Sequence, residues 1–516
     1  MISNRRHVMQ GIVGATTAPG LAWAAEAPKL EVETRLGKIR GVVHQGTRLF
    51  RGIPYGGDTS GRNRFMPPTR PAGWSGTRDC TDWGHIAPRK ISSDPVSEYT
   101  RLVGWNNYRG GISEDCLNLN VWAPLSGPGK RAVMVAFHGG GFTSGSGNLA
   151  ALEGDHLVRE GDVVVVTVNH RLGALGYTDL SAWPGTEFAK SGVVGMMDCV
   201  AALEWVRDNI ANFGGDPGKV LIFGQSGGGA KCSALMCMPS AKGLFHRAAL
   251  QSGSTIKLTH HDMARKDSGA LLAKLGVGAG ELAKLQAMPF EQIVAAQANT
   301  RPVVDGTIIP RDPFDPDAPA ISAGVPMIIG TCLEDQGLGM TDWDIDEAGL
   351  RSWVESQVPG QTDKVLSEYR KLYPARRPFL IKAMIATDKA WRRNAVLQGE
   401  RKIAQGVAPA YMYRWDWPSP AAGGKFGAIH GADLSMSFYN ADTGVGTNSP
   451  QARRMAERLG SAYLAFAKTG NPNNPKIPRW APYNTTDRPV MVFDNQTRLE
   501  NDPNAGLRAM WERMAS

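Results

Sequence analysis

Three runs of almost uninterrupted apolar residues constrain the fold most. They cover residues 132–137, 163–168 and 220–223. A continuous apolar run fits a strand that is covered on both faces, as in a parallel or mixed sheet. Between the second and third runs, apolar residues recur every three or four positions and share one helix face: Met196, Val200, Leu203, Val206 and Ile210. This alternation predicts an α/β protein with a central, mostly parallel, twisted sheet flanked by helices.

Two long stretches, about 255–320 and 340–425, carry helical patterns and few strand patterns. We expect them to be insertions that pack over the carboxyl edge of the sheet, where ligands bind in open α/β folds. Residues 30–43 contain short alternating runs broken by glycine, which indicates a hairpin-rich edge of the sheet. No repeat or low-complexity linker divides the chain, so residues 25–516 are expected to form a single catalytic domain.

A G-x-S-x-G pattern centred on Ser226 directly follows the third apolar run. A helix-compatible segment follows over about 228–236, and this strand–turn–helix context is typical of a nucleophile elbow. Glycine at 224 and 228 avoids the collisions that side chains would cause in so tight a turn, and the helix N-terminus favours developing negative charge. We therefore predict that Ser226 is a nucleophile rather than an incidental serine in a glycine-rich turn.

The sequence His-Gly-Gly-Gly-Phe at residues 138–142 directly follows the first apolar run. Consecutive glycines let backbone N–H groups approach a substrate oxygen, which gains negative charge in the transition state of acyl transfer. We predict an oxyanion hole made by the amides of Gly140, Gly141 and Gly227. A phosphate-binding loop is the alternative, but the Gly-Lys-Ser/Thr ending of such loops is missing.

Further blocks, in the same order along the chain, resemble the type-B carboxylesterase family, which includes bacterial p-nitrobenzyl-type esterases, fungal lipases and cholinesterases. The resemblance implies an α/β-hydrolase fold with a gorge that leads to the active site. A loop residue, Trp105, is then expected either to line the gorge or to be a buried structural residue. Besides the two glycine motifs, the similar blocks are residues 50–55, 64–68, 114–122, 169–173, 212–217, 243–247 and 470–472.

A serine nucleophile needs a base, which follows the nucleophile and the acid in the chain order of this fold. His430 is the only histidine after His261, and it also matches the family's G-x-x-H-x-x-[DE] block. Small neighbouring residues suit a loop histidine that must reach the serine. We predict that His430 is the base, although an isolated loop histidine would otherwise be expected at the surface.

The acid is predicted from residues 327–330, which form a buried strand pattern, and the Glu-Asp-Gln-Gly that follows shortly after. The family usually has Asp-Glu-Gly here, and its Glu is catalytic. Counting from Gly330 places Asp335 on that Glu, with Glu334 as the alternative and Asp433 as a disfavoured third candidate. By the same resemblance, Ser252 is expected to lie near the acid.

Two positions depart from the family pattern beside the nucleophile. Gln225 stands where the family often has Glu, which removes a negative charge and disfavours a cationic, choline-like substrate. Gly227 stands where Ala is more common, and the missing side chain is expected to loosen the elbow.

The first 24 residues have the features of an export signal. Arg5 and Arg6 precede a weakly apolar stretch over about 11–23, and Ala22-Trp23-Ala24 fits a small-x-small cleavage site. This predicts a twin-arginine-type signal over residues 1–24 and a periplasmic or secreted protein, with a disordered cytosolic tail as the other interpretation.

The six cysteines form no CxxC motif and no Cys/His pair at zinc spacing. In an oxidising compartment Cys80 and Cys116 could pair, and the resemblance also supports this disulfide. The other four, in apolar contexts, are expected to be buried thiols.

The formal charge of +9 is spread without a dense Lys/Arg run or a nucleic-acid-binding motif, so we expect no nucleic acid partner. No apolar run is long enough for a membrane helix, so we expect no membrane insertion. The predicted function is hydrolysis of a small-molecule carboxylic ester through a covalent acyl-enzyme. That chemistry needs no metal or organic cofactor, and we expect a monomer or a weak dimer.

Two alternatives stay open. One is a non-catalytic binding or adhesion module on the same fold; such relatives commonly lose the serine that this chain retains. The other keeps the chemistry but cleaves an amide, carbamate or lactone, because the same catalytic groups serve all of these bonds. Acyl and alcohol preference does not follow from the motifs.

Overall fold

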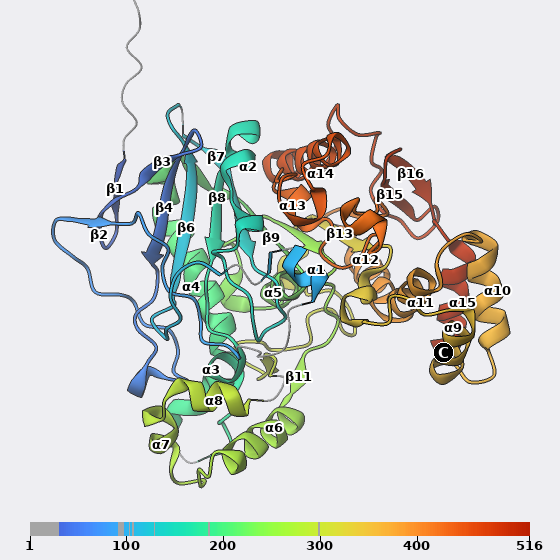
Figure 1. Cartoon of the computed structure of the whole chain (residues 1–516). Helices are drawn as coiled ribbons and strands as arrows, with labels where there is room; N and C mark the ends of the chain where they lie inside the picture. Colours follow the sequence, from blue (N-terminus) through green and yellow to red (C-terminus); the bar gives the residue numbers. More distant parts are fainter. Residues whose placement is uncertain are drawn as a thin grey trace, which may run out of the picture.

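A central sheet of eleven strands organises the molecule (Figure 1). The computed structural model describes residues 30–90, 97–102, 104–105, 108–127, 129–183, 186–297 and 300–515. In sheet order the strands are β16 (Arg498–Asn501), β15 (Pro489–Phe493), β14 (Ala410–Trp415), β13 (Met327–Cys332), β10 (Arg247–Gln251), β9 (Gly215–Gln225), β7 (Arg131–Phe137), β8 (Val164–Val168), β6 (Asn118–Pro124), β4 (Thr47–Pro54) and β3 (Val42–His44).

Neighbouring strands from β15 to β8 run parallel, and the pairs outside this range run antiparallel. The three apolar runs form the adjacent strands β7, β8 and β9, and β7 and β8 are buried throughout. This confirms the predicted α/β class with a mostly parallel central sheet.

Alternate residues of the central strands face two separate apolar layers. Val133 and Val135 of β7 pack into the layer that contains helices α4 (Val194–Asn209) and α5 (Gly227–Leu235). Met134 and Ala136 face the opposite layer, which contains α2 (Asp155–Gly161) and α14 (Pro450–Thr469). Helices therefore cover both faces of the sheet, which explains why the strands carry no polar alternation.

The two predicted insertions contain helices. The first holds α6 (His261–Lys274), α7 (Leu282–Ala287), α8 (Phe290–Ala296) and the short pair β11 (Thr259–His260) and β12 (Val303–Val304). The second holds α9 (Glu347–Gln357), α10 (Thr362–Leu372), α11 (Pro378–Thr387) and α12 (Arg393–Ile403). In Figure 1, α6 to α8 gather at one end of the molecule, while α9 to α11 lie beside the C-terminal α15 (Ala505–Ala515).

The predicted second insertion extends too far, because residues 340–425 include β14, a strand in the parallel part of the sheet. Its sequence contains Arg414, which breaks the apolar run. The side chain is buried nonetheless, because Asp416 accepts two hydrogen bonds from its guanidinium at 2.6 Å. Because the charge of Arg414 is neutralised by Asp416, the strand can be buried, and a search for apolar runs does not detect it.

The N-terminal hairpin also differs from the prediction. Strands β1 (Glu31–Thr34) and β2 (Gly37–Arg40) join β5 (Thr77–Asp79) in a separate three-stranded sheet, and only β3 continues to the edge of the main sheet. The predicted export signal lies outside the described residues. Among the residues described, no helix is long and apolar enough to cross a membrane.

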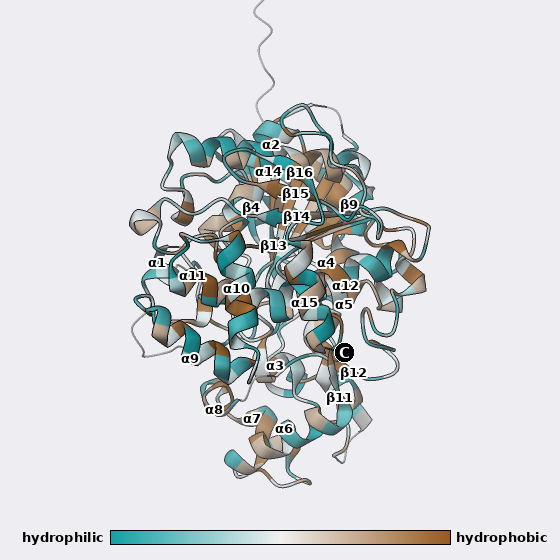
Figure 2. Cartoon of the chain, turned by 90° about the vertical axis from the view of Figure 1, so that its right-hand side faces the viewer, coloured by the Kyte–Doolittle hydropathy of each residue, from teal (hydrophilic) through white to brown (hydrophobic). Residues whose placement is uncertain are grey.

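Helices on the outside of the molecule have one apolar and one polar face. In Figure 2, α9 and α10 alternate between hydrophilic and hydrophobic colours along their length. In α10 the buried positions include Val365 and Tyr369, which lie four residues apart and share one face. These two helices therefore present their polar faces to water.

Three short α-helices complete the α-helices described: α1 (Glu98–Leu102), α3 (Gly173–Tyr177) and α13 (Leu434–Ser437). A π-helical turn over Asp388–Arg392 joins α11 to α12. The turn matters for the site below, because π-helical turns occur often at functional positions. Trp391 lies on it.

Candidate active site

Ser226 sits at a sharp turn between β9 and α5. Its backbone adopts φ 57° and ψ −124°, a conformation that residues other than glycine rarely take. Two hydrogen bonds hold this turn: the Ser226 amide donates to the Gln251 carbonyl at 2.7 Å, and the Ala230 amide donates to the Ser226 carbonyl at 3.0 Å. The surrounding structure therefore maintains a strained serine at the carboxyl edge of the sheet.

The glycines of this turn pack against the end of β7 and its following loop. A Cβ atom at Gly224 or at Gly228 would collide with the Phe137 carbonyl oxygen, and one at Gly227 would collide with the Gly141 carbonyl oxygen. Gly227 was expected to loosen the elbow. In the structure the elbow is instead closely packed, because the missing side chain allows the backbones of Gly227 and Gly141 to touch.

The glycine loop after β7 has an unusual backbone. Gly140 and Gly141 have φ values of 90° and 61°, which favour glycine. Because Gly141 touches Gly227, the predicted oxyanion donors of the loop and of the elbow lie next to each other. Gly140, Gly141 and Ser226 also line the same cavity.

His430 and Asp335 form a buried pair. The imidazole Nδ1 lies 2.9 Å from Asp335 Oδ1, so the Nδ1–H group of the ring donates a hydrogen bond to the carboxylate. The second oxygen of Asp335 accepts hydrogen bonds from the Ser252 hydroxyl at 2.9 Å and from the Cys332 amide at 2.8 Å. These contacts fix the carboxylate, which in turn fixes the orientation of the His430 ring.

The other two candidate acids face elsewhere. Glu334 accepts a hydrogen bond from the Ala428 amide at 2.9 Å and pairs with Arg376, and burial raises the pKa of Glu334. Asp433 accepts a hydrogen bond from the Tyr413 hydroxyl at 2.6 Å, and burial raises the pKa of Asp433 to about 6. Of the three candidates, Asp335 is the one that hydrogen-bonds the imidazole.

The opposite nitrogen of His430 faces a side chain next to the nucleophile. Gln225 Nε2 lies 3.0 Å from His430 Nε2. Within the described part of the chain, the Ser226 hydroxyl has no hydrogen bond to His430. Catalytic hydrogen bonds are often long or absent before substrate binds, so this geometry is compatible with a nucleophile–base pair.

Aromatic side chains surround the His430 ring. The ring of Trp391 lies 4.4 Å away, centroid to centroid, and that of Trp105 lies 6.2 Å away, both nearly perpendicular to the imidazole. The Tyr99 hydroxyl donates to the His430 carbonyl at 2.6 Å. Trp105, which the sequence left open as either a gorge or a core residue, lines the cavity beside Ser226. The sequence did not indicate Trp391, because no local feature marks it as a neighbour of His430.

The cavity beside Ser226 has a volume of about 320 Å³. Its polar lining consists of the glycine loop, Gln225, Ser226 and His430, with the hydroxyls of Thr100 and Ser144 near them. None of the described residues that line it carries a carboxylate, ammonium or guanidinium group. The larger apolar and aromatic lining side chains are Trp105, Tyr108, Leu149, Leu152, Leu338 and Leu434.

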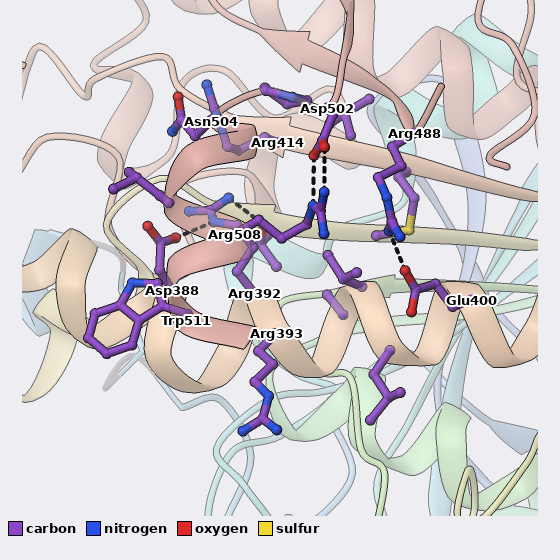
Figure 3. Close-up of a pocket in the computed structure, with 18 of the residues that line it drawn as sticks. Asp388, Arg392, Arg393, Glu400, Arg414, Arg488, Asp502, Asn504, Arg508 and Trp511 are labelled. Atoms are coloured by element: carbon purple, nitrogen blue, oxygen red, sulfur yellow. Dashed lines mark hydrogen bonds and ion pairs between the residues drawn. The ribbon is translucent and has the colours of Figure 1, made fainter. Parts of the chain in front are cut away.

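A second cavity, of about 390 Å³, lies between the β14–β15 part of the sheet and helices α12 and α15 (Figure 3). Its described lining contains no serine, cysteine or histidine, so it has no serine–histidine or cysteine–histidine pair. Figure 3 shows that three of its arginines are paired with carboxylates, in the pairs Arg392–Asp388, Arg488–Glu400 and Arg508–Asp502. In the described part of the chain, no group of three or more His, Cys, Asp or Glu is arranged to hold a metal ion.

The structure does not contain the disulfide predicted between Cys80 and Cys116, and both are buried free thiols. The charged groups that act on the Cys80 thiol are Arg78 and Asp79, whereas those that act on the Cys116 thiol include Asp198 and Arg171. Burial raises the pKa of each thiol, to about 11 for Cys80.

Comparison with known proteins gives consistent matches over almost the whole chain. The sequence profile of the carboxylesterase family matches residues 28–511. The para-nitrobenzyl esterase of Bacillus subtilis is 34% identical over 498 residues, covering 92% of this chain and 97% of that protein. The phenmedipham hydrolase of Pseudarthrobacter oxydans is 30% identical over 489 residues, covering 90% and 94%.

Solved structures also match over almost the whole chain. A carboxylesterase from Geobacillus stearothermophilus superimposes with a TM-score of 0.81 at 32% identity, over 94% of this chain and 100% of that one. An esterase from Clostridium hathewayi, described as able to hydrolyse aliphatic aromatic polyesters, superimposes with a TM-score of 0.80 at 31% identity, over 94% and 98%.

Proposed function

The chain belongs to the carboxylesterase family and is a serine carboxylic ester hydrolase on the α/β-hydrolase fold, and from this premise we propose that Ser226, His430 and Asp335 carry out the reaction through a covalent acyl-enzyme. One observation carries the assignment: a strained serine and a carboxylate-held histidine line the same cavity as the glycine loop. This combination is the one that acyl transfer requires.

In the first half of the reaction, the Ser226 hydroxyl replaces the Gln225 amide at His430 Nε2. The imidazole takes the hydroxyl proton as Oγ forms a bond to the ester carbonyl carbon. The amides of Gly140, Gly141 and Gly227 hold the resulting oxyanion. The bond to the alcohol oxygen then breaks, and the imidazolium gives its proton to the leaving alcohol.

In the second half, a water molecule gives a proton to His430 Nε2 and attacks the acyl carbon. The same amides hold the second oxyanion, the bond to Ser226 Oγ breaks, and the proton returns to that oxygen. Asp335 stays ionised and stabilises the imidazolium in both halves.

For the substrate, we propose neutral esters with small apolar or aromatic acyl and alcohol groups. The uncharged lining and the volume of about 320 Å³ support this class. The names of two relatives, a para-nitrobenzyl esterase and an esterase that hydrolyses aliphatic aromatic polyesters, agree with an aromatic substituent. A panel of esters that varies acyl and alcohol groups separately measures this preference, and amides, carbamates and lactones of the same groups belong in it.

The decisive test compares wild type with Ser226→Ala on short-chain p-nitrophenyl esters. Loss of the nucleophile should lower kcat by about 10⁶. The folded wild type should also react with a fluorophosphonate probe at Ser226. If the variant keeps more than about 1% of the activity, Ser226 is not the nucleophile. If the folded wild type neither hydrolyses these esters nor reacts with the probe, the chain is a binding module instead.

We also propose export to the periplasm or the medium, with cleavage after Ala24. Arg5-Arg6 and Ala22-Trp23-Ala24 support this. N-terminal sequencing of the protein recovered from fractionated cells tests it, since an intact N-terminus on cytoplasmic protein would contradict export.

A further inference from the structure

Beneath the glycine loop, the structure holds a buried lysine that the mechanism above does not use. Lys231 lies on α5, five residues after Ser226, and its side chain is 0% exposed. We infer that Lys231 is a positioning residue that locks the oxyanion hole, tying the loop after β7 to the nucleophile elbow. This inference deepens the proposed function and rests on it.

The three hydrogen atoms of the ammonium are matched by three carbonyl oxygens. Lys231 Nζ lies 2.8 Å from the Gly141 carbonyl, 3.1 Å from the His138 carbonyl and 3.3 Å from the Gly227 carbonyl. An ammonium has three donors and no acceptor, so this arrangement satisfies it completely. Two of the acceptors belong to Gly141 and Gly227, whose own amides are proposed to hold the oxyanion.

This arrangement matters because glycine backbones are the most mobile. A loop of consecutive glycines has no side chains with which to anchor itself, and its amides must lie within about 3 Å of the developing oxyanion. A misplacement of about 1 Å can cost a large factor in rate. By fixing carbonyls on both sides of the Gly141–Gly227 contact, Lys231 replaces the missing anchors.

The Lys231 ammonium also carries a charge among titratable neighbours that are neutral near pH 7. The titratable groups that face it are His138 after β7, His170 after β8, Cys199 on α4 and Cys232 on α5. Burial lowers the pKa of both histidines and raises the pKa of both thiols, so all four are neutral near pH 7. Among the described residues, no carboxylate forms an ion pair with Lys231, and burial lowers its pKa to about 8. A positive charge behind the hole also favours the oxyanion.

The chain contains a matched control for this residue. Lys402 on α12 is equally buried, and its Nζ donates to the Ser322 carbonyl at 3.1 Å, the Ala323 carbonyl at 2.7 Å and Gln405 Oε1 at 3.0 Å. Burial lowers its pKa to about 8 as well. It does not line the cavity beside Ser226, so Lys402→Met has a similar structural cost without touching the hole.

The experiment compares wild type, Lys231→Met and Lys402→Met for kcat, KM, thermal unfolding and affinity for a trifluoromethyl ketone, whose adduct with serine places an oxyanion in the hole. Lys231→Met should lower kcat and ketone affinity together, by at least about tenfold, with KM changed less than about threefold. Lys402→Met should lower Tm to a similar extent and leave kcat within about twofold.

Equal kcat losses in the two variants, or a Lys231→Met loss that appears in KM alone, would overturn the inference. Wild-type turnover separates this failure from that of the proposed function: an inactive wild type overturns both, whereas an active wild type with an unimpaired Lys231→Met overturns the inference alone.

If Lys231→Met does not fold, Lys231→Gln and the pH profile of kcat decide the matter. Wild-type and Lys402→Met kcat should both fall as pH rises through about 8, because the neutral amine keeps only two donors and loses its charge. Lys231→Gln should show reduced kcat without that fall. A wild-type kcat that is level from pH 7 to 10 contradicts the inference.

Discussion

The amide of Gln225 lies 3.0 Å from Nε2 of His430, at the nitrogen that has to receive the nucleophile's proton. Nδ1 of the same ring donates to Asp335, so Nε2 is the acceptor and Gln225 is the donor. A glutamate at this position could not make that contact with a neutral imidazole. Gln225 therefore occupies the acceptor nitrogen of His430 in this structure. It also keeps the described lining of the cavity uncharged.

Gln225→Glu should create a preference for cationic esters. A carboxylate next to Ser226 attracts a cation by about 1 kcal/mol in a partly solvated cavity. We expect the kcat/KM for acetylcholine, relative to its neutral analogue 3,3-dimethylbutyl acetate, to rise about fivefold. Gln225→Ala serves as the control and should leave the ratio unchanged; an unchanged ratio in Gln225→Glu would count against a substrate group beside this residue.

Asp335→Asn and Glu334→Gln should separate the two neighbouring acids. Without the carboxylate at 335 the imidazolium loses its partner, and we expect kcat to fall by about 10³–10⁴. Glu334→Gln leaves Arg376 unpaired and should lower Tm while kcat stays within a few-fold. Steady-state kinetics and thermal unfolding of both variants measure this, and a larger kcat loss in Glu334→Gln would reverse the assignment.

Asp198→Asn should be strongly destabilising. Asp198 accepts three hydrogen bonds from Arg171, from its backbone amide at 3.1 Å and its guanidinium at 2.8 and 2.6 Å, and the side chains are 0% and 2% exposed. Removing one partner of a buried ion pair costs about 3–5 kcal/mol.

Urea denaturation measures the loss, with Asp363→Asn as the control. Asp363 pairs with Arg351 at 2.6 Å, but both side chains are more than half exposed, at 86% and 58%. Its loss should cost less than about 1 kcal/mol. Similar losses in the two variants would mean that the buried pair is not held as the structure has it.

Asp433 should make the protein less stable as pH rises from about 4 to about 6. Burial raises its pKa from 3.8 to about 6, so in this window the folded state binds more protons than the unfolded state. The free energy of unfolding then falls with rising pH, by roughly 1–3 kcal/mol from this group. The pH dependence of urea denaturation should show this fall in wild type relative to Asp433→Asn; parallel curves for the two proteins would contradict it.

Local patterns were enough to predict the parts of the fold that depend on local chemistry. The strands β7, β8 and β9 follow from continuous apolar runs, and the elbow at Ser226 follows from glycines placed between a strand and a helix. The choice of Asp335 as the acid came from the family resemblance, aligned from Gly330 in β13, and in the structure Asp335 Oδ1 lies 2.9 Å from His430 Nδ1.

Features that depend on distant partners did not follow from the sequence. Strand β14 was not predicted, because Arg414 interrupts its apolar run and is neutralised only within the fold. Lys231 gave one local signal, a lone charge in an otherwise small and apolar helix segment, but its meaning lies in carbonyls about ninety residues earlier in the chain. The contact of Gln225 with His430 spans about two hundred residues and has no local signature.

The contact between Gly227 and Gly141 couples two residues of α5, Gly227 and Lys231. In this chain an added Cβ at position 227 would strike the Gly141 carbonyl that Lys231 holds. The effects of substitutions at 227 and 231 should therefore be non-additive, because both residues act on the same carbonyl.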